Sequence, residues 1–259
     1  MKTVILCGGL GTRLAEETEL RPKPMVEIGG LPMLWHIMKI YDYHGFKDFV
    51  LTLGYKGEVI KDYFLNYYQR TSDITVELAA GRVDCSNHGL EDWTVRMMDT
   101  GQNTMTGGRL HRLESILRPQ GTFMLTYGDG VADIDISALM KFHKKHGKLA
   151  TVTAVRPSAR FGTMQFDDDL VTHFHEKPQT GEGWINGGFF VFEPEIFDYL
   201  HGDITVLEGE PLENLAKSKQ LMAFHHTGFW QCMDTIRDRN SLNQEWAKDN
   251  APWKVWKDK

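Results

Sequence analysis

The stretch KTVILCGGLGTRL, residues 2–14, decides the fold. A short apolar run, rich in β-branched residues, ends in a glycine-rich turn, which is the pattern of a buried strand opening a parallel α/β sheet. Gly8, Gly9 and Gly11 leave the backbone N–H groups of this turn uncovered by side chains. Uncovered N–H groups after a strand suit the oxygens of a nucleotide phosphate.

Two basic side chains lie close to this turn in the sequence. Arg13 follows Thr12 directly after the last glycine, and Lys23 stands between two prolines. A guanidinium of fixed charge and a braced ammonium indicate that several negative charges meet here. The string is not a dinucleotide-binding fingerprint, because Leu14 stands where a third glycine is needed, and it is not a Walker loop. It predicts a triphosphate site, with a plain tight turn as the alternative.

The composition is that of an ordinary soluble globular protein. The chain has 259 residues, of which 41% are hydrophobic and 25% charged, and we expect one domain over residues 1–259. A net charge of −6 argues against a nucleic-acid partner. No apolar stretch suits a membrane span or a signal peptide, so we expect no membrane partner. Three widely spaced cysteines are typical of the cytoplasm and predict neither a disulfide nor a zinc site.

Strand-like and helix-like segments alternate through the first 150 residues, which favours a Rossmann-like, doubly wound α/β sheet with right-handed crossovers. After residue 150, short strands joined by polar turns predict added antiparallel or mixed strands. Residues 81–108 have weak periodicity, and we expect an ordered insertion over the site or, alternatively, a mobile loop. The expected strands are 3–6, 49–53, 123–127, 151–155, 163–166, 171–176 and 188–192. The expected helices are 31–41, 59–64, 110–117, 136–146, 212–217 and 236–246.

Two aspartates follow apolar runs that are far apart in the sequence. Asp129 stands in a Gly-Asp-Gly segment at the carboxyl end of an expected strand, which is the ligand-binding edge of such a sheet. Its hard oxygen donors suit Mg²⁺. Capping of the next helix is the alternative role, but Asp133 and Asp135 are better placed for it. Asp234 directly precedes another expected helix, and its spacing alone favours a capping role.

The string GGLGTRL, with PKP at residues 22–24, resembles the signature of the sugar-1-phosphate nucleotidylyltransferases, enzymes of the nucleotide-diphospho-sugar transferase fold. The resemblance implies transfer of a nucleotidyl group from a nucleoside triphosphate to a sugar 1-phosphate. It implies Mg²⁺ as cofactor, held by Asp129 and Asp234. It also implies that Arg13 braces the leaving pyrophosphate and that Lys23 neutralises the reacting phosphates.

The same resemblance implies two sets of substrate contacts. The implied nucleotide contacts are Leu6, Gly8, Gly9, Gly11, Thr12, Arg13, Thr104, Arg109 and Gly128. The implied sugar-phosphate contacts are Lys23, Gly162, Glu176, Lys177, Asn186 and Gly188. Arg109 would otherwise only start the helix expected from Leu110, and a cation is unfavourable at that end. This mismatch favours an external anion as the partner of Arg109.

Nearly the whole chain is similar to the branch of the family that uses CTP and α-D-glucose 1-phosphate and assembles as a homohexamer. The segments that carry this likeness include residues 95–109, 126–133, 185–190 and 228–234. We therefore expect these substrates, with dTTP or UTP as the alternative nucleotide.

Two other functions stay open on the sequence. A metal-dependent glycosyltransferase would not need Arg13 and Lys23 around a triphosphate, and a noncatalytic nucleotide sensor would not need the two aspartates as well. Near the carboxyl end, Trp253 and Trp256 could pack on a neighbouring subunit or on their own.

Overall fold

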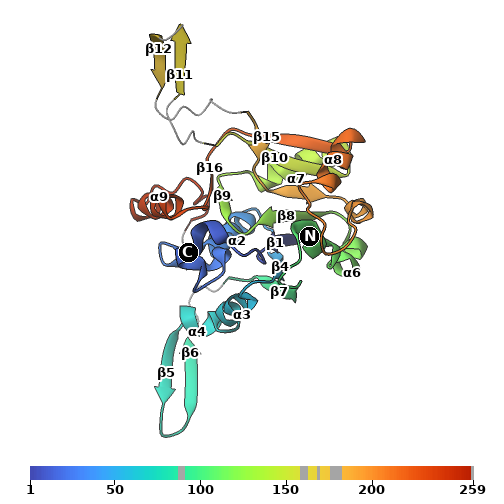
Figure 1. The fold of residues 1–259 in the computed structure, drawn as a ribbon. Coiled ribbons are helices and arrows are strands. Elements are labelled where there is room, and N and C mark those ends of the chain that lie inside the picture. Colours follow the sequence, from blue (N-terminus) through green and yellow to red (C-terminus); the bar gives the residue numbers. More distant parts are fainter. Residues whose placement is uncertain (87–90, 158–162, 168–169, 176–182, 258–259) are drawn as a thin grey trace.

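The glycine-rich turn follows the central strand of an eight-stranded mixed sheet, as the sequence predicts (Figure 1). The computed structural model describes residues 1–86, 91–157, 163–167, 170–175 and 183–257. Four strands, β8, β1, β4 and β7, run parallel, so their carboxyl ends meet at one edge. In spatial order the sheet contains β13 (Ile185–Asn186), β10 (Ala150–Val155), β14 (Phe190–Phe192), β8 (Phe123–Tyr127), β1 (Lys2–Leu6), β4 (Asp48–Leu53) and β7 (Thr94–Asp99), with β15 (Leu221–His226) on β10.

The strands added after residue 150 confirm the expected mixed character of the sheet. β14 pairs antiparallel with β8, and β10 pairs antiparallel with β14 and β13. The parallel pairing of β15 with β10 was not expected, because β15 is half-exposed and its sequence has no clear alternation. Four two-stranded sheets complete the fold: β2 (Glu27–Ile28) with β3 (Leu31–Pro32), β5 (Asp73–Glu77) with β6 (Arg82–Ser86), β9 (Gly130–Ala132) with β16 (Trp230–Cys232), and β11 (Thr163–Asp167) with β12 (Leu170–His175).

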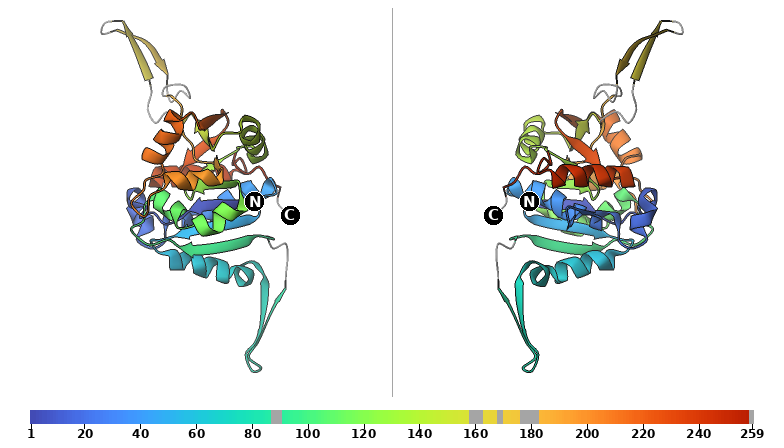
Figure 2. Two further views of the ribbon diagram at one scale, coloured as in Figure 1. Left: turned by 90° about the vertical axis from the view of Figure 1, so that its right-hand side faces the viewer. Right: turned by 90° about the vertical axis from the view of Figure 1, so that its left-hand side faces the viewer.

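Helices cover both faces of the main sheet, which confirms the doubly wound α/β class (Figures 1 and 2). Ile5 of β1 packs in one core cluster with residues of α2, α3, α7 and α9, whereas Val4 packs in a second cluster with residues of α5, α6 and α8. Burial on both faces explains the continuous apolar run of β1. The helices are α1 (Ala15–Thr18), α2 (Met33–Tyr43), α3 (Gly57–Leu65), α4 (Tyr67–Thr71), α5 (Thr106–His111), α6 (Glu114–Leu117), α7 (Ile136–His146), α8 (Glu210–Lys217) and α9 (Ile236–Ala247).

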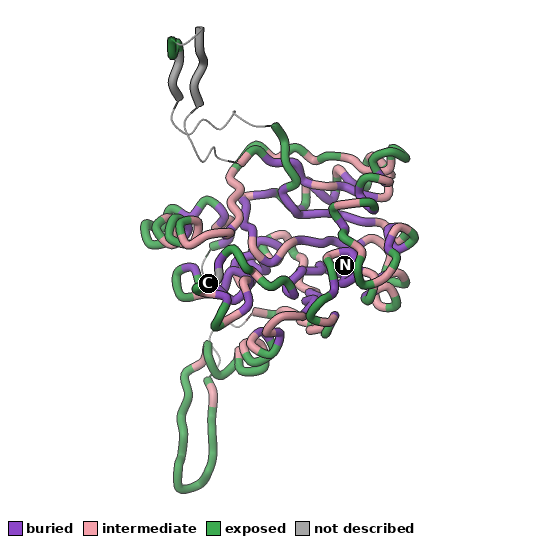
Figure 3. Tube along the Cα trace, in the orientation of Figure 1, coloured by how far each residue is buried: buried purple, intermediate pink, exposed green. Residues whose placement is uncertain are grey.

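The expectation of one insertion over the site at residues 81–108 was wrong for most of that segment. β6 pairs with β5 in a hairpin that extends away from the body and is almost wholly exposed (Figures 1 and 3). β7 lies at the edge of the main sheet. Among the described residues of this segment, only those that follow β7 reach the predicted site. Edge and exposed strands bury little apolar surface, so their hydrophobic periodicity is weak.

The aromatic residues near the carboxyl end pack on their own subunit. Trp253 is fully buried, and its indole N–H donates to His36 Nδ1 at 3.3 Å. The other ring nitrogen of His36 faces the carbonyl of Ile28 at 2.9 Å. Burial lowers the pKa of His36 to about 4, so this side chain is neutral at pH 7. The rings of Trp246 and Trp256 also contact His36, so the cluster fixes the chain end against α2.

Within the described part of the chain, no helix is both long enough and apolar enough to span a bilayer.

Replacing Trp253 by alanine should lower the free energy of unfolding by about 3–5 kcal/mol, because a large buried ring is lost and His36 loses its donor. Thermal and chemical denaturation measure this effect. Ile204→Ala is the control: this side chain is 86% exposed and its loss should change stability by less than about 0.5 kcal/mol. Equal effects of the two substitutions would contradict the packing described here.

Candidate active site

A cavity of about 580 Å³ opens at the carboxyl edge of the parallel strands, within the usual range for a small-molecule site. It lies where ligands bind in open α/β sheets. All four predicted catalytic residues and all nine predicted nucleotide contacts line it. They are Leu6, Gly8, Gly9, Gly11, Thr12, Arg13, Lys23, Thr104, Arg109, Gly128, Asp129 and Asp234.

Backbone pairing brings the two distant aspartates together. Asp129 lies between β8 and β9, and Asp234 lies two residues after Cys232, the last residue of β16. β16 pairs antiparallel with β9, so that Cys232 faces Gly130, and the N–H of Met233 donates to the carbonyl of Asp129 at 2.8 Å. Two segments about one hundred residues apart therefore present their carboxylates to the same space.

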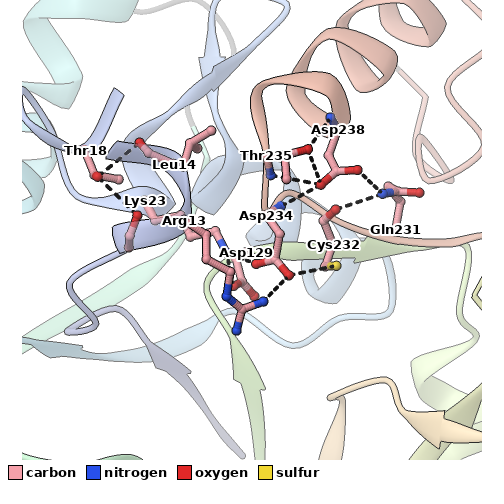
Figure 4. A network of polar contacts seen from close by, with 11 residues as sticks. Arg13, Leu14, Thr18, Lys23, Asp129, Gln231, Cys232, Asp234, Thr235 and Asp238 are labelled. Carbon is pink, nitrogen blue, oxygen red and sulfur yellow. Dashed lines mark hydrogen bonds and ion pairs between the residues drawn. The ribbon is translucent and has the colours of Figure 1, made fainter. Parts of the chain in front are cut away.

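Lys23 joins the two carboxylates (Figure 4). Its ammonium donates to Asp129 Oδ2 at 2.7 Å and to Asp234 Oδ1 at 2.6 Å. Arg13 donates to the other oxygen of Asp234 at 2.7 Å. Two cations from the amino-terminal segment thus face two anions from the two later segments, and the four charges form one cluster.

The ionisation of this cluster follows from burial and from the pairing. Burial works against the charged form of Lys23, but the charges and hydrogen bonds of both aspartates outweigh it and raise the pKa of Lys23. Burial likewise works to raise the pKa of Asp234, but Lys23 and Arg13 outweigh it and lower that pKa. At neutral pH Lys23 is therefore cationic and Asp234 anionic.

Helix capping does not occupy either carboxylate of the pair. Thr235 is the N-cap of α9, and the side chain of Asp238 completes a capping box with it. The spacing-based assignment of a cap to Asp234 is thus wrong, because its neighbour takes that role. Asp135 caps α7 by accepting from the N–H of Ala138 at 2.8 Å, as expected.

The carboxylate pair fits a hard divalent cation. The space between Asp129 and Asp234 already holds a cationic group, the Lys23 ammonium, at hydrogen-bond distance from an oxygen of each. Two carboxylates with phosphate oxygens and water form the usual shell of Mg²⁺ at nucleotide sites. Among the described residues, no group of three or more histidine, cysteine or acidic side chains is placed to hold a metal. Phosphate oxygens and water would supply the remaining ligands of a cation held by these two carboxylates.

Arg13 differs from Lys23 in its exposure. The Arg13 side chain is 76% exposed, whereas that of Lys23 is 12% exposed. An ion pair with such an exposed partner stabilises the fold little, so the guanidinium can leave Asp234 at small cost when a better anion arrives.

Arg109 has a different setting from the one expected. The helix that contains it begins at Thr106, so Arg109 is not at the helix start, and the argument for an external anion from that position was wrong. The guanidinium is buried, and burial lowers its pKa. Among the described residues it donates to uncharged oxygens only, namely Gly8 O, Leu53 O, Thr100 Oγ1, Gly101 O and Gln102 O, at 2.7–3.2 Å.

Arg109 therefore holds together the turns that follow β1, β4 and β7. The carbonyl of Gly8 belongs to the glycine-rich turn, and Leu53 and Gly101 end or follow the two neighbouring strands. A Cβ on Gly8 would lie 2.2 Å from the Cζ atom of Arg109, so the side chain packs flat against this glycine. The glycine at position 8 is thus needed for the close approach of the guanidinium as well as for an uncovered turn.

The predicted sugar-phosphate contacts are only partly within the described residues. Gly162, Glu176 and Lys177 lie outside them. Asn186 ends β13, and Gly188 lies in the short connection to β14; the side-chain oxygen of Asn186 accepts from the N–H of Gly188 at 2.9 Å.

Several lining residues were not predicted from the sequence. Tyr127 directly precedes the Gly-Asp segment at the end of β8, and this position at the edge of the sheet was the available signal. Cys7, Leu10 and Pro24 belong to the amino-terminal segment. The remaining four lie between the end of β7 and the first residue of α5, where weak periodicity concealed the ordered turn. They are Gln102, Asn103, Met105 and Thr106.

Comparison with known proteins gives the class of the chain. The model of the nucleotidyl transferase family matches residues 2–238, and the chain belongs to that family. Glucose-1-phosphate cytidylyltransferase of Salmonella typhi is 53% identical to it over 99% of this chain and 100% of that protein. The probable glucose-1-phosphate cytidylyltransferase of Bacillus subtilis is 45% identical over the same shares.

Solved structures show the same fold at low sequence identity. HddC from Yersinia pseudotuberculosis superposes with a TM-score of 0.68 at 24% identity, over 95% of this chain and 99% of that one. A UDP-glucose pyrophosphorylase complexed with UDP-glucose superposes with a TM-score of 0.68 at 16% identity, over 96% and 98%. These likenesses support the α/β class and are too distant to decide the substrate.

The contact between Gly8 and Arg109 can be tested by stability. Gly8→Ala should destabilise the protein by about 1–3 kcal/mol, because the new methyl group displaces a buried guanidinium that makes five hydrogen bonds. Gly9→Ala, one residue on, meets no atom within 4 Å and should change stability by less than about 0.5 kcal/mol. Denaturant unfolding of both variants measures the difference, and equal stability of the two would contradict the contact.

Proposed function

We propose that the chain transfers a cytidylyl group from CTP to α-D-glucose 1-phosphate, giving CDP-glucose and pyrophosphate. The observation that carries the proposal is the cluster in which Lys23 bridges Asp129 and Asp234 beside the glycine-rich turn. Identity of 53% along the full length of a glucose-1-phosphate cytidylyltransferase supports the choice of both substrates. The whole chain acts as one nucleotidylyltransferase domain.

The reaction is an in-line displacement at the α-phosphorus of CTP. A phosphate oxygen of glucose 1-phosphate forms the new P–O bond, and the bond to the bridging oxygen of the β-phosphate breaks as pyrophosphate leaves. The nucleophile is already anionic at neutral pH, so no covalent enzyme intermediate is needed. Positioning and charge neutralisation carry the catalysis.

The residues of the cavity divide this work among them. The N–H groups of the turn around Gly8, Gly9 and Gly11 receive the triphosphate. Arg13, which is exposed and only loosely held, braces the leaving pyrophosphate. Lys23 exchanges a carboxylate partner for the α-phosphate and the attacking phosphate. Asp129 and Asp234 would hold Mg²⁺, which neutralises charge on the reacting phosphates when bound.

Removing one carboxylate should abolish most of the activity while the fold stays intact. We expect Asp129→Asn to lower kcat by about a thousandfold or more, because charge neutralisation at the reacting phosphates is lost. Asp135→Asn is the control, since asparagine also caps helices and this residue lies outside the cavity. Pyrophosphate release measures both variants, and near-normal turnover of Asp129→Asn would remove this residue from the mechanism.

A panel of nucleotides tests the choice of base. The purified protein with Mg²⁺ and glucose 1-phosphate should release pyrophosphate fastest, by kcat/KM, with CTP, compared with UTP and dTTP. A higher kcat/KM with UTP or dTTP would overturn the assignment of the base and leave nucleotidyl transfer standing. No release with any triphosphate would overturn the function as a whole.

We further propose that the chain assembles as a homo-oligomer, a hexamer by its similarity to the cytidylyl-transferring branch of the family. The β5–β6 hairpin supports this assembly because one of its faces is apolar and exposed. Ile74, Val76 and Val83 share this face and are 46–53% exposed, with Leu78 beyond them at 88%. An isolated two-stranded hairpin is marginal in water, and contact with another copy would cover it.

Charge on the apolar face of the hairpin should break the assembly. Val76→Lys is expected to shift the sedimentation coefficient to that of a smaller species. Thr75→Lys places the same charge on the opposite face, because neighbouring strand residues point to opposite sides, and should leave the coefficient unchanged. A monomeric native protein, or equal behaviour of the two variants, would contradict assembly through this hairpin.

A further inference from the structure

A chain of hydrogen bonds joins two residues that line the cavity, Tyr127 and Thr106, to Glu208 and Asn186, which are not among the lining residues. The hydroxyl of Tyr127 donates to Glu208 Oε1 at 2.5 Å and accepts from Asn186 Nδ2 at 3.1 Å. The other oxygen of Glu208 accepts from the hydroxyl of Thr106 at 2.6 Å. Glu208 therefore touches both a residue of the nucleotide-side segment and, through Tyr127, the turn that contains Asn186.

The backbone fixes Glu208 beside this cavity. The N–H of Leu207, its neighbour, donates to Thr106 Oγ1 at 2.9 Å. The N–H of Gly108 donates to the carbonyl of Thr205 at 3.0 Å. The packing is tight, since a Cβ on Gly108 would lie 2.4 Å from the carbonyl oxygen of Asp203. Residues 203–208 are thus held against the start of α5. The backbone at Glu208 is therefore fixed, although its side chain reaches the surface.

The direction of each hydrogen bond follows from the chemistry of Glu208. An ionised carboxylate only accepts, so the hydroxyl of Tyr127 must donate to it. The phenol oxygen then offers lone pairs to Asn186, which must present its NH₂ group there. The amide oxygen of Asn186 consequently faces the N–H of Gly188, where it accepts at 2.9 Å. The N–H of Gly188 and the chain from Glu208 through Tyr127 therefore favour the same orientation of the Asn186 amide.

The protonation of the Tyr127 phenol maintains the direction of these hydrogen bonds. Burial, and then the charge of Glu208, raise the pKa of the Tyr127 phenol, so it keeps its proton at neutral pH. The ring also packs under the turn, because a Cβ on Gly188 would lie 3.0 Å from Tyr127 Cδ2.

We infer that Glu208 and Tyr127 are positioning residues for the sugar 1-phosphate: they orient the Asn186 amide and the Gly188 turn so that one amide N–H and one lone pair face the sugar hydroxyls. The inference rests on the proposed function, since it places the sugar beside Asn186 and Gly188. An amide has two N–H groups and two lone pairs, and the contacts above use one of each. The remaining pair forms a donor and acceptor of fixed order, which suits the hydroxyl groups of a hexose.

Glu208→Gln tests the order of the hydrogen bonds without removing the side chain. Glutamine replaces one acceptor oxygen by a donor. When that NH₂ group faces Tyr127, the phenol must accept there, and its O–H then opposes the NH₂ group of Asn186, which only Gly188 continues to orient. We expect KM for glucose 1-phosphate to rise about tenfold at saturating CTP, the cost of about one hydrogen bond, with kcat changed less than about threefold. Tyr127→Phe breaks the same chain at its next link and should have the same effect.

The double variant with Glu208→Gln and Tyr127→Phe shows whether the two side chains act through one chain of hydrogen bonds or independently. The double variant should be no worse than either single variant, because each already breaks the chain. Glu210→Gln is the matched control: it lies two residues on, at the exposed start of α8, and should leave both KM values unchanged.

The inference is overturned if Glu208→Gln behaves like Glu210→Gln, if the KM effects of the two substitutions multiply, or if only kcat falls. A native protein that releases no pyrophosphate with any triphosphate would instead overturn the proposed function. If the native protein is active and Glu208→Gln is silent, the inference about positioning alone fails.

Discussion

The ion pairs of Lys23 with Asp129 and Asp234 are the constraint on which the rest of the site depends. Two half-buried carboxylates that face each other repel, and a cation between them offsets this repulsion. Lys23 is that cation here, at 2.7 and 2.6 Å from their oxygens. A divalent cation could take the place of the ammonium between the carboxylates, because its charge has the same sign. The space between the two carboxylates would then hold a cation both before and after the substrates arrive.

Parallel topology brings the parts of this cluster to one edge, and two further devices fix it there. The β9–β16 pairing sets Asp234 beside Asp129, and a capping box from Thr235 and Asp238 leaves the Asp234 carboxylate available. Arg109 ties the turns after three parallel strands through uncharged oxygens. A buried cation that donates to carbonyls orders the turns and keeps positive charge beside the cavity. Fold stability and site geometry thus share the same contacts.

Part of this arrangement could be read from the sequence. Local sequence patterns predict three of its features: the buried strand before the glycines, the parallel sheet, and the aspartate at the end of a strand. Apolar runs and the alternation of strand-like and helix-like segments are sufficient for these predictions. The closeness of Asp129 and Asp234 could not follow from spacing, since it depends on the pairing of β16 with β9, and the resemblance supplied it. The argument for an external anion at Arg109 failed because its helix begins four residues earlier than expected, whereas its role as a nucleotide contact stays a prediction. The β5–β6 hairpin and β7 were missed because exposed and edge strands carry weak hydrophobic patterns.

A crystal structure with CDP-glucose and Mg²⁺ tests the central claim most directly. We predict a Mg²⁺ ion about 2.1 Å from an oxygen of both Asp129 and Asp234, with the Lys23 ammonium moved from at least one carboxylate to a phosphate oxygen. The claim would be contradicted if product and metal were bound while Lys23 still bridged both aspartates, or if the metal lay away from either of them.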